Sequence, residues 1–232
     1  MKGRLTGAGI CAAVLAAIFA ADTEAERQVP IEKLIYDRQL QALQREGLRG
    51  AAAVTGTYVG EALSADFGSP TSLSALVSSS EIIVAATVIH NRCVMTRDGL
   101  SILTHYFART DEVIKGTSPS NRELRLIVPG GRVAFPDGSW AQLNLKGFIR
   151  PETGESYVLF LKSASSLYRT ENAIDDSSYM PVFGPLGVYH LKPVGRIIPA
   201  GGYRTAFGRS IASGRLTSAE FLTMIRSIAR EN

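Results

Sequence analysis

A succession of short apolar segments separated by turn residues most constrains how this 232-residue chain can fold. The run from Ile82 to Ile89 is apolar and rich in β-branched residues, which is typical of a strand buried on both faces. Further strands are predicted at 101–114, 123–128, 141–146 and 156–162, with shorter ones at 166–169 and 188–191. Short strands at this spacing predict a mainly β protein built on a small closed or half-closed β-barrel.

Helical patterns precede the strands. Apolar residues recur at helical spacing in residues 30–47, and Gly47 ends the pattern. Residues 47–68 show no clear period and are predicted to form a linker or loop. Ser69-Pro70 then opens a short helix, because proline fits the first helical turn after a serine cap. The apolar side of this helix consists of Leu73, Leu76 and Val77.

A second helix is predicted at the C-terminal end of the chain. Thr217 and Glu220 have the spacing of a capping box, and Leu216 and Phe221 are placed as a hydrophobic staple. The helix runs to about Arg230. Its apolar face is expected to pack against the barrel.

The N-terminal segment has the three parts of a secretory signal peptide. Lys2 and Arg4 precede an uncharged apolar run at 7–21, and Thr23 and Ala25 supply small residues before a cleavage site that follows Ala25. The run is shorter than the roughly 20 residues of a membrane span, and no later segment reaches that length. We therefore expect an exported protein, periplasmic or extracellular, with no transmembrane segment after cleavage. An uncleaved N-terminal anchor is the alternative.

Charge and cysteine content exclude several classes of protein. Lys and Arg number 25 and Asp and Glu 21, and this net charge of +4 without a basic stripe argues against a nucleic-acid partner. Signal cleavage would remove Cys11 and leave Cys93 alone, so no internal disulfide is expected. Burial of apolar side chains must then hold the fold together.

His90 and Cys93 form a His-x-x-Cys pattern that suits either a zinc site or a thiolate–imidazole pair. A tetrahedral zinc ion needs three or four protein ligands, so His105 or His190 would have to complete the set. The alternative is a surface histidine beside a partly buried thiol that packs as a small apolar group. We favour the alternative, and predict no metal, no cofactor and no catalytic residue.

Trp140 is the one tryptophan of the chain and begins a predicted strand. In strand register it shares a face with Gln142, Asn144 and Lys146, opposite the apolar Ala141, Leu143 and Leu145. If the apolar set faces the core, the indole points outward, where it can stack on a sugar ring or anchor a protein partner. The alternative is that a neighbouring turn or a terminal helix covers Trp140.

Four segments in order carry a resemblance to a known family: Leu73–Val88, Asp111–Gly116, Val128–Gly131 and Gly154–Leu161. Together they resemble exported bacterial domains similar to the tissue inhibitors of metalloproteinases, an OB-type barrel also called netrin-like. The resemblance covers residues 71–191 and implies a fold and a compartment. It implies no inhibitory mechanism, because the animal inhibitors chelate zinc through an N-terminal cysteine, whereas the mature chain here would begin at Glu26.

These observations divide the chain into four parts: a signal peptide (1–25), a helical segment and linker (26–68), an OB-like β-barrel domain (69–195), and a linker with a C-terminal helix (196–232). The predicted function is a non-catalytic binding or interaction module of the cell envelope, with an envelope protein or glycan as partner. The first alternative is an inhibitor of extracellular hydrolases such as proteases. The second is a zinc- or thiol-dependent enzyme.

Overall fold

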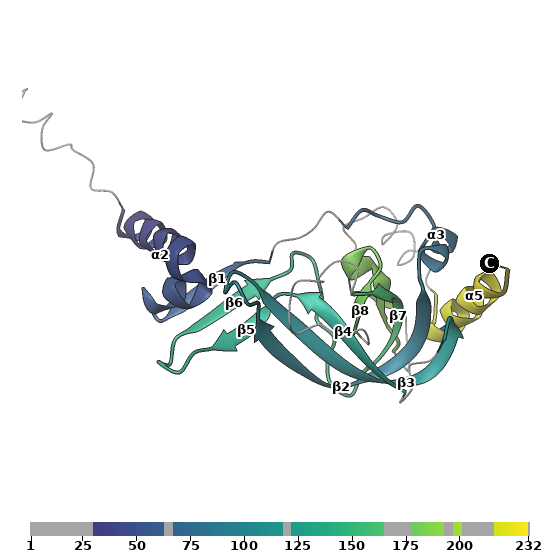
Figure 1. The fold of residues 1–232 in the computed structure, drawn as a ribbon. Helices are drawn as coiled ribbons and strands as arrows, with labels where there is room; N and C mark the ends of the chain where they lie inside the picture. Colours follow the sequence, from purple (N-terminus) through teal and green to yellow (C-terminus); the bar gives the residue numbers. More distant parts are fainter. Residues whose placement is uncertain are drawn as a thin grey trace, which may run out of the picture.

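A computed structural model of the chain describes residues 30–62, 67–117, 122–164, 178–192, 197–200 and 216–231. The fold is mainly β, as predicted, with two sheets and three α-helices in the described ranges (Figure 1). The predicted signal peptide and the predicted strand at 166–169 lie outside the described residues. None of the helices within these ranges is both long enough and apolar enough to span a membrane.

The larger sheet has the strand order β10-β9-β7-β2-β3-β4-β8. β8 also pairs with β7, so the pairings of β7, β2, β3, β4 and β8 form a continuous cycle of five strands. Within this cycle only the β4–β8 pairing is parallel. The strands are β2 (Ile82–Met95), β3 (Ile102–Lys115), β4 (Glu123–Pro129), β7 (Ser156–Ser163), β8 (Ser178–Pro181), β9 (Val188–His190) and β10 (Ile198–Pro199).

The predicted strands of this sheet are confirmed, and β2 is longer than predicted. The apolar run of β2 is buried up to Val88, whereas the extension to Met95 is largely exposed. It remains a strand because it pairs with the first half of β3, as far as Met95 opposite Ile102. A strand made by pairing with one neighbour does not need the continuous apolar run on which the prediction rested.

The smaller sheet contains β1 (Thr57–Glu61), β5 (Gly131–Ala134) and β6 (Trp140–Asn144), in the order β1-β6-β5. The prediction that residues 47–68 form a loop is wrong, because they contain both β1 and the end of a helix. β1 pairs in parallel with β6, from Thr57 opposite Trp140 to Glu61 opposite Asn144. It therefore belongs to the same folded unit as the strands that follow residue 69.

Helix α2 (Ile31–Ala53) is broken where the sequence predicted its end. Gly47 has a φ of 68°, and a β-carbon there would lie 2.6 Å from the carbonyl oxygen of Gly99, so the position requires glycine. The chain then resumes a helical course because Leu48, Ala51 and Ala52 are buried.

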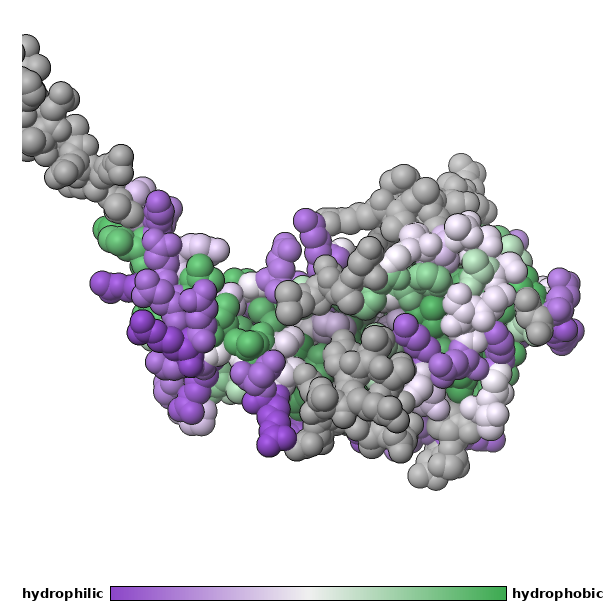
Figure 2. Space-filling view, turned by 45° about the horizontal axis from the view of Figure 1, so that its top comes forward, coloured by the Kyte–Doolittle hydropathy of each residue, from purple (hydrophilic) through white to green (hydrophobic). Residues whose placement is uncertain are grey.

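The first part of α2 projects at one end of the molecule (Figure 1) and leaves apolar side chains exposed among charged ones (Figure 2). The exposed apolar residues are Ile31, Leu34, Ile35, Tyr36 and Leu40. The break at Gly47 thus separates a thinly packed first part from a well-packed end.

Helix α3 (Leu73–Ser78) starts later than predicted. Its N-cap is Ser72, whose Oγ accepts a hydrogen bond from the amide of Ala75 at 3.0 Å, and not Ser69. Ser72 can serve because it adopts an extended backbone (φ −154°, ψ 169°) just before the first helical residue. The predicted apolar side is confirmed, since Leu73, Leu76 and Val77 are buried.

Helix α5 (Ser218–Glu231) has the predicted capping box. The amide of Glu220 donates to Thr217 Oγ1 at 3.3 Å, and the amide of Thr217 donates to a Glu220 carboxylate oxygen at 2.8 Å. Phe221 and Ile225 are fully buried. Arg226 adds a two-point ion pair with Glu112 of β3, at 2.8 and 2.6 Å. The helix is therefore held on the sheet both by buried apolar side chains and by an ion pair.

Two main apolar clusters occupy the two sides of the large sheet. One lies within the cycle of strands and includes Val84, Tyr106, Leu126 and Leu159. The other covers the outer face of β2 and β7, where α3 and α5 pack. Because residues alternate between faces, Tyr157 belongs to the inner cluster while its neighbour Val158 belongs to the outer one.

Candidate functional site

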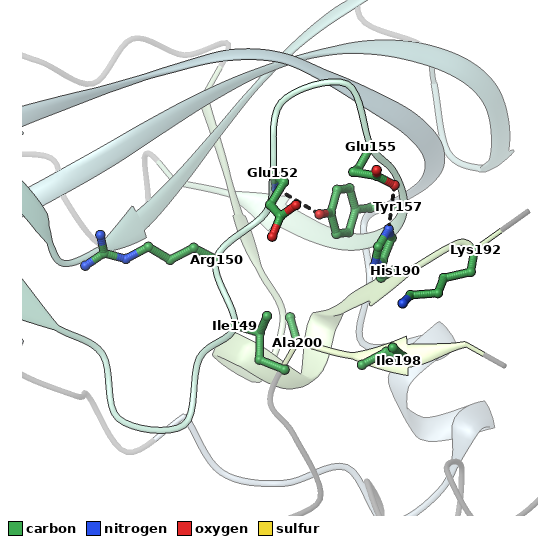
Figure 3. Close-up of a pocket in the computed structure, with 9 residues that line it drawn as sticks. All are labelled: Ile149, Arg150, Glu152, Glu155, Tyr157, His190, Lys192, Ile198 and Ala200. Atoms are coloured by element: carbon green, nitrogen blue, oxygen red, sulfur yellow. Dashed lines mark hydrogen bonds and ion pairs between the residues drawn. The ribbon is translucent and has the colours of Figure 1, made fainter. Parts of the chain in front are cut away.

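A pocket of about 600 Å³ lies beside β7, β9 and β10, a size typical of sites that bind small molecules. Polar, charged and apolar side chains all line it (Figure 3): Ile149, Arg150, Glu152, Glu155, Tyr157, His190, Lys192, Ile198 and Ala200. Two apolar residues of the lining are joined through the backbone, since the amide of Ile149 donates to the carbonyl of Ala200 at 2.7 Å.

Strand pairing brings the two aromatic rings of the pocket together. Tyr157 of β7 lies directly opposite His190 of β9, so both side chains leave the sheet on the same face. Their rings stack with centroids 4.9 Å apart and an angle of 22° between the planes. His190 Nε2 lies 2.9 Å from a carboxylate oxygen of Glu155, the residue immediately before β7. The imidazole is thereby fixed on one face by Tyr157 and at one nitrogen by Glu155.

The turn before β7 is tied to the same tyrosine. The backbone amide of Glu152 donates to the Tyr157 hydroxyl at 2.8 Å. Gly154, with a φ of 88°, lets the chain reverse between Glu152 and Glu155. The positions of both carboxylates are thus set by a turn anchored to a buried ring.

The surroundings of Tyr157 raise the pKa of its hydroxyl above the ordinary value of 10, so the hydroxyl is protonated at neutral pH. Burial is the main cause that raises its pKa. The hydrogen bond from the Glu152 amide lowers the pKa by less than burial raises it, and the carboxylates of Glu152 and Glu155 each add a smaller increase. A tyrosine hydroxyl that accepts one hydrogen bond still carries a proton to donate. Tyr157 therefore offers the pocket a neutral donor.

Charged groups of both signs surround the opening. The side chains of Glu152 and Lys192 point into the pocket from different sides, whereas the guanidinium of Arg150 points away from it (Figure 3). Arg150 Nη2 lies 3.3 Å from the backbone oxygen of Leu143 and 3.3 Å from Asn144 Oδ1. Arg150 is therefore engaged with β6, and it connects the wall of the pocket to the smaller sheet.

Three residues of the predicted binding surface lie on strand β6 of that smaller sheet, whereas Lys146 lies in the turn after it, because β6 ends at Asn144 and not at residue 146 as predicted. Ala141, Leu143 and Leu145 are buried, and Trp140, Gln142, Asn144 and Lys146 are partly or fully exposed, so the predicted alternation is present. Gln142 Nε2 donates to Asn144 Oδ1 at 2.8 Å. The guanidinium of Arg132 lies 3.9 Å from the centre of the Trp140 ring. A ligand that stacks on that ring face would have to displace a cation–π contact.

His90 and Cys93 point to opposite faces of β2 and are not brought together. The His90 ring stacks on Phe107 with centroids 4.3 Å apart, whereas Cys93 packs against the inner cluster with its sulfur 3.5 Å from Thr104 Oγ1. His105 is buried opposite Arg92, and His190 lies in the pocket. Among the described residues, no group of three or more His, Cys, Asp or Glu side chains is arranged to hold a metal ion.

The sequence pattern points to His190 only as a possible zinc ligand and to none of the other pocket residues. Glu152, Glu155 and Lys192 are ordinary charged residues at the ends of predicted strands. The one sequence signal is that Arg150, Glu152 and Glu155 cluster around the Gly154 turn, immediately before a strongly apolar strand. That signal is weak, because charged turns before buried strands are common.

A comparison with models of known protein families finds no match for this chain, and a search of curated proteins finds no similar sequence. The interpretation of the pocket therefore depends on its own geometry and chemistry.

Proposed function

We propose that this protein is an exported, non-catalytic binding module of the cell envelope whose ligand occupies the pocket beside His190. The observation that carries the proposal is the pocket itself, with about 600 Å³ of space, an apolar wall and convergent polar groups. An apolar cavity with a few fixed polar groups is the usual form of a small-molecule site.

The way His190 is held suits a preorganised binding site. Its Nε2 is engaged by Glu155 and its ring is stacked on Tyr157. Tyr157 in turn is tied to the backbone of Glu152. Side chains fixed in this way form a rigid wall, and a preorganised wall lowers the entropic cost of binding a ligand.

We further propose that residues 69–195 form an OB-like barrel. Support comes from the cycle of five paired strands, from the apolar cluster enclosed by that cycle and from the sequence resemblance to netrin-like domains. The OB-fold is a five-stranded Greek-key barrel that binds ligands on one face and in its loops. The predicted surface of Trp140, Gln142, Asn144 and Lys146 would then lie next to the pocket, through Arg150, and could extend the contact with an envelope protein or glycan.

The experiment compares ligand binding by two histidine variants. The protein is expressed from its full coding chain, and fractions of envelope extract are tested for an increase in its unfolding temperature. The variants are His190→Gln, in the pocket, and His90→Gln, which removes an exposed ring stacked on Phe107. Circular dichroism first establishes that both variants retain the fold.

We expect at least one fraction to stabilise the wild-type protein and His90→Gln but not His190→Gln. Stabilisation of a protein by a ligand that binds only the folded state grows with ligand concentration relative to Kd. If no fraction stabilises the wild-type protein, or if His190→Gln responds like His90→Gln, the pocket is not the binding site and the proposal is wrong.

A further inference from the structure

We infer that the ligand of this pocket is a zwitterion, namely a short peptide with a free α-amino group and a free α-carboxylate. The inference rests on the proposed binding function and names the class of ligand. It follows from which charges of the pocket are engaged with the protein and which are directed at the cavity.

Two of the four acidic and basic side chains of the lining, Arg150, Glu152, Glu155 and Lys192, already have protein partners. Glu155 is bonded to His190, and Arg150 reaches the Leu143 carbonyl and Asn144. Their charges are therefore directed at the protein.

The other two, Glu152 and Lys192, point into the cavity from different sides (Figure 3). In the described part of the chain, neither of them has an ion-pair partner. The cavity thus presents one carboxylate and one ammonium group to a ligand.

Charge balance favours a ligand that carries both signs. The two carboxylates, Glu152 and Glu155, and the two cations, Arg150 and Lys192, of the lining cancel, so these four side chains give the pocket no net attraction for an anion or a cation. A ligand with a single charge would satisfy one of Glu152 and Lys192 and desolvate the other without a partner. A ligand with an ammonium group at one end and a carboxylate at the other pairs with both.

The rest of the lining suits the middle of a peptide. Ile149, Ile198 and Ala200 form an apolar wall, and Ile149 is 54% exposed and able to cover an apolar side chain. The protonated Tyr157 hydroxyl can donate to a peptide carbonyl. About 600 Å³ is the volume of sites that take drug-sized molecules, which favours a short peptide over a free amino acid.

The test measures binding of four forms of the same dipeptides by calorimetry: unmodified, N-acetylated, C-amidated and blocked at both ends. A panel with different apolar side chains is used, together with free leucine. The protein variants are Glu152→Gln and Lys192→Met. Glu32→Gln and Lys33→Met, both on the exposed start of α2, are matched controls that remove the same charges elsewhere.

We expect the unmodified dipeptides to bind at least about tenfold more tightly than the doubly blocked forms, which is the usual size of a charged hydrogen bond. Glu152→Gln should lose the preference for a free amino group and keep the preference for a free carboxylate. Lys192→Met should show the reverse, and the α2 controls should behave like the wild-type protein.

Equal binding of all four forms, tighter binding of free leucine than of any dipeptide, or no binding across the panel would each overturn the inference. The proposed function stands in those cases if an envelope fraction still stabilises the wild-type protein and not His190→Gln. If that fraction experiment fails as well, the proposed function and the inference are both wrong.

Discussion

Replacing Phe221 with alanine tests whether α5 is held on the sheet mainly by burial. The Phe221 side chain is 0% exposed, and its ring lies 4.8 Å from that of Tyr189 and 6.4 Å from that of Phe160. Truncating a fully buried phenylalanine costs about 3–5 kcal/mol, from lost burial and from the cavity that remains. At about 2–4 °C per kcal/mol for a chain of this size, the melting temperature should fall by roughly 6–20 °C.

Urea unfolding monitored by circular dichroism measures this loss, and hydrogen exchange shows whether α5 is released alone or with the sheet. Met224→Ala, on the same helix but at a side chain that is 41% exposed, is the control and should change stability by about 0.5 kcal/mol or less. A 14-residue helix is marginal by itself, so α5 needs its buried contacts. If Phe221→Ala costs less than about 1 kcal/mol, or no more than Met224→Ala, burial does not hold the helix.

Three further outcomes can be checked. The hydrogen bond from Arg226 is the main cause that lowers the pKa of Glu112. The stabilisation that this ion pair gives is therefore present above the ordinary pKa of 4.5 and is lost as the pH falls through the lowered pKa. Glu112→Gln should flatten the curve of unfolding free energy against pH in this acidic range. Gly131→Ala should cost about 1–3 kcal/mol in urea unfolding, because φ is 142° and a β-carbon would lie 2.7 Å from two side-chain atoms, whereas Gly138→Ala has open space and only its positive φ to oppose it. If Trp140 stacks on an envelope glycan, Trp140→Ala should weaken retention on that glycan without unfolding the protein, and unchanged retention would exclude a sugar-stacking role.

Five strands of the larger sheet, β2, β3, β4, β7 and β9, could be predicted from sequence because a run or an alternation of apolar residues marks them, whereas the short β8 and β10 were not predicted. The run Ile82–Ile89 is apolar on both faces, since one face meets the inner cluster and the other meets α3 and α5. The C-terminal helix could be predicted because its cap is a local interaction between Thr217 and Glu220. In both cases the signal is local: a continuous run of apolar residues marks the strand, and two residues three positions apart mark the start of the helix.

β1 and β5 could not be predicted in this way. β1 has five residues, includes a glycine and exposes Val59, so no alternating pattern marks it. It is a strand because β6, far along the chain, supplies its hydrogen-bond partners. β5 begins at Gly131, within a Pro-Gly-Gly stretch that indicates a turn. Partners distant in sequence decide both elements, and local propensity carries no information about them.

The pocket was beyond sequence reasoning for the same reason. Tyr157 and His190 belong to different strands and meet only because β9 pairs with β7. The sequence shows that Glu152 and Lys192 are charged but not that they point into one cavity. The partial exposure of Trp140 could be predicted, because the alternation of buried and exposed residues along a single strand is a local property of the sequence.

The packing of α5 also bears on the pocket, since the helix and the site share strand β9. Phe221 packs on Tyr189, whose neighbour His190 faces the cavity from the other side of the same strand. Ser218, at the start of α5, donates to the backbone carbonyl of Lys192 at 2.9 Å. A docked α5 therefore fixes both the strand that carries the imidazole and the backbone of the lysine whose ammonium group points into the pocket. Because coupling between two equilibria is reciprocal, a ligand that requires Lys192 in this position must also stabilise the docked helix.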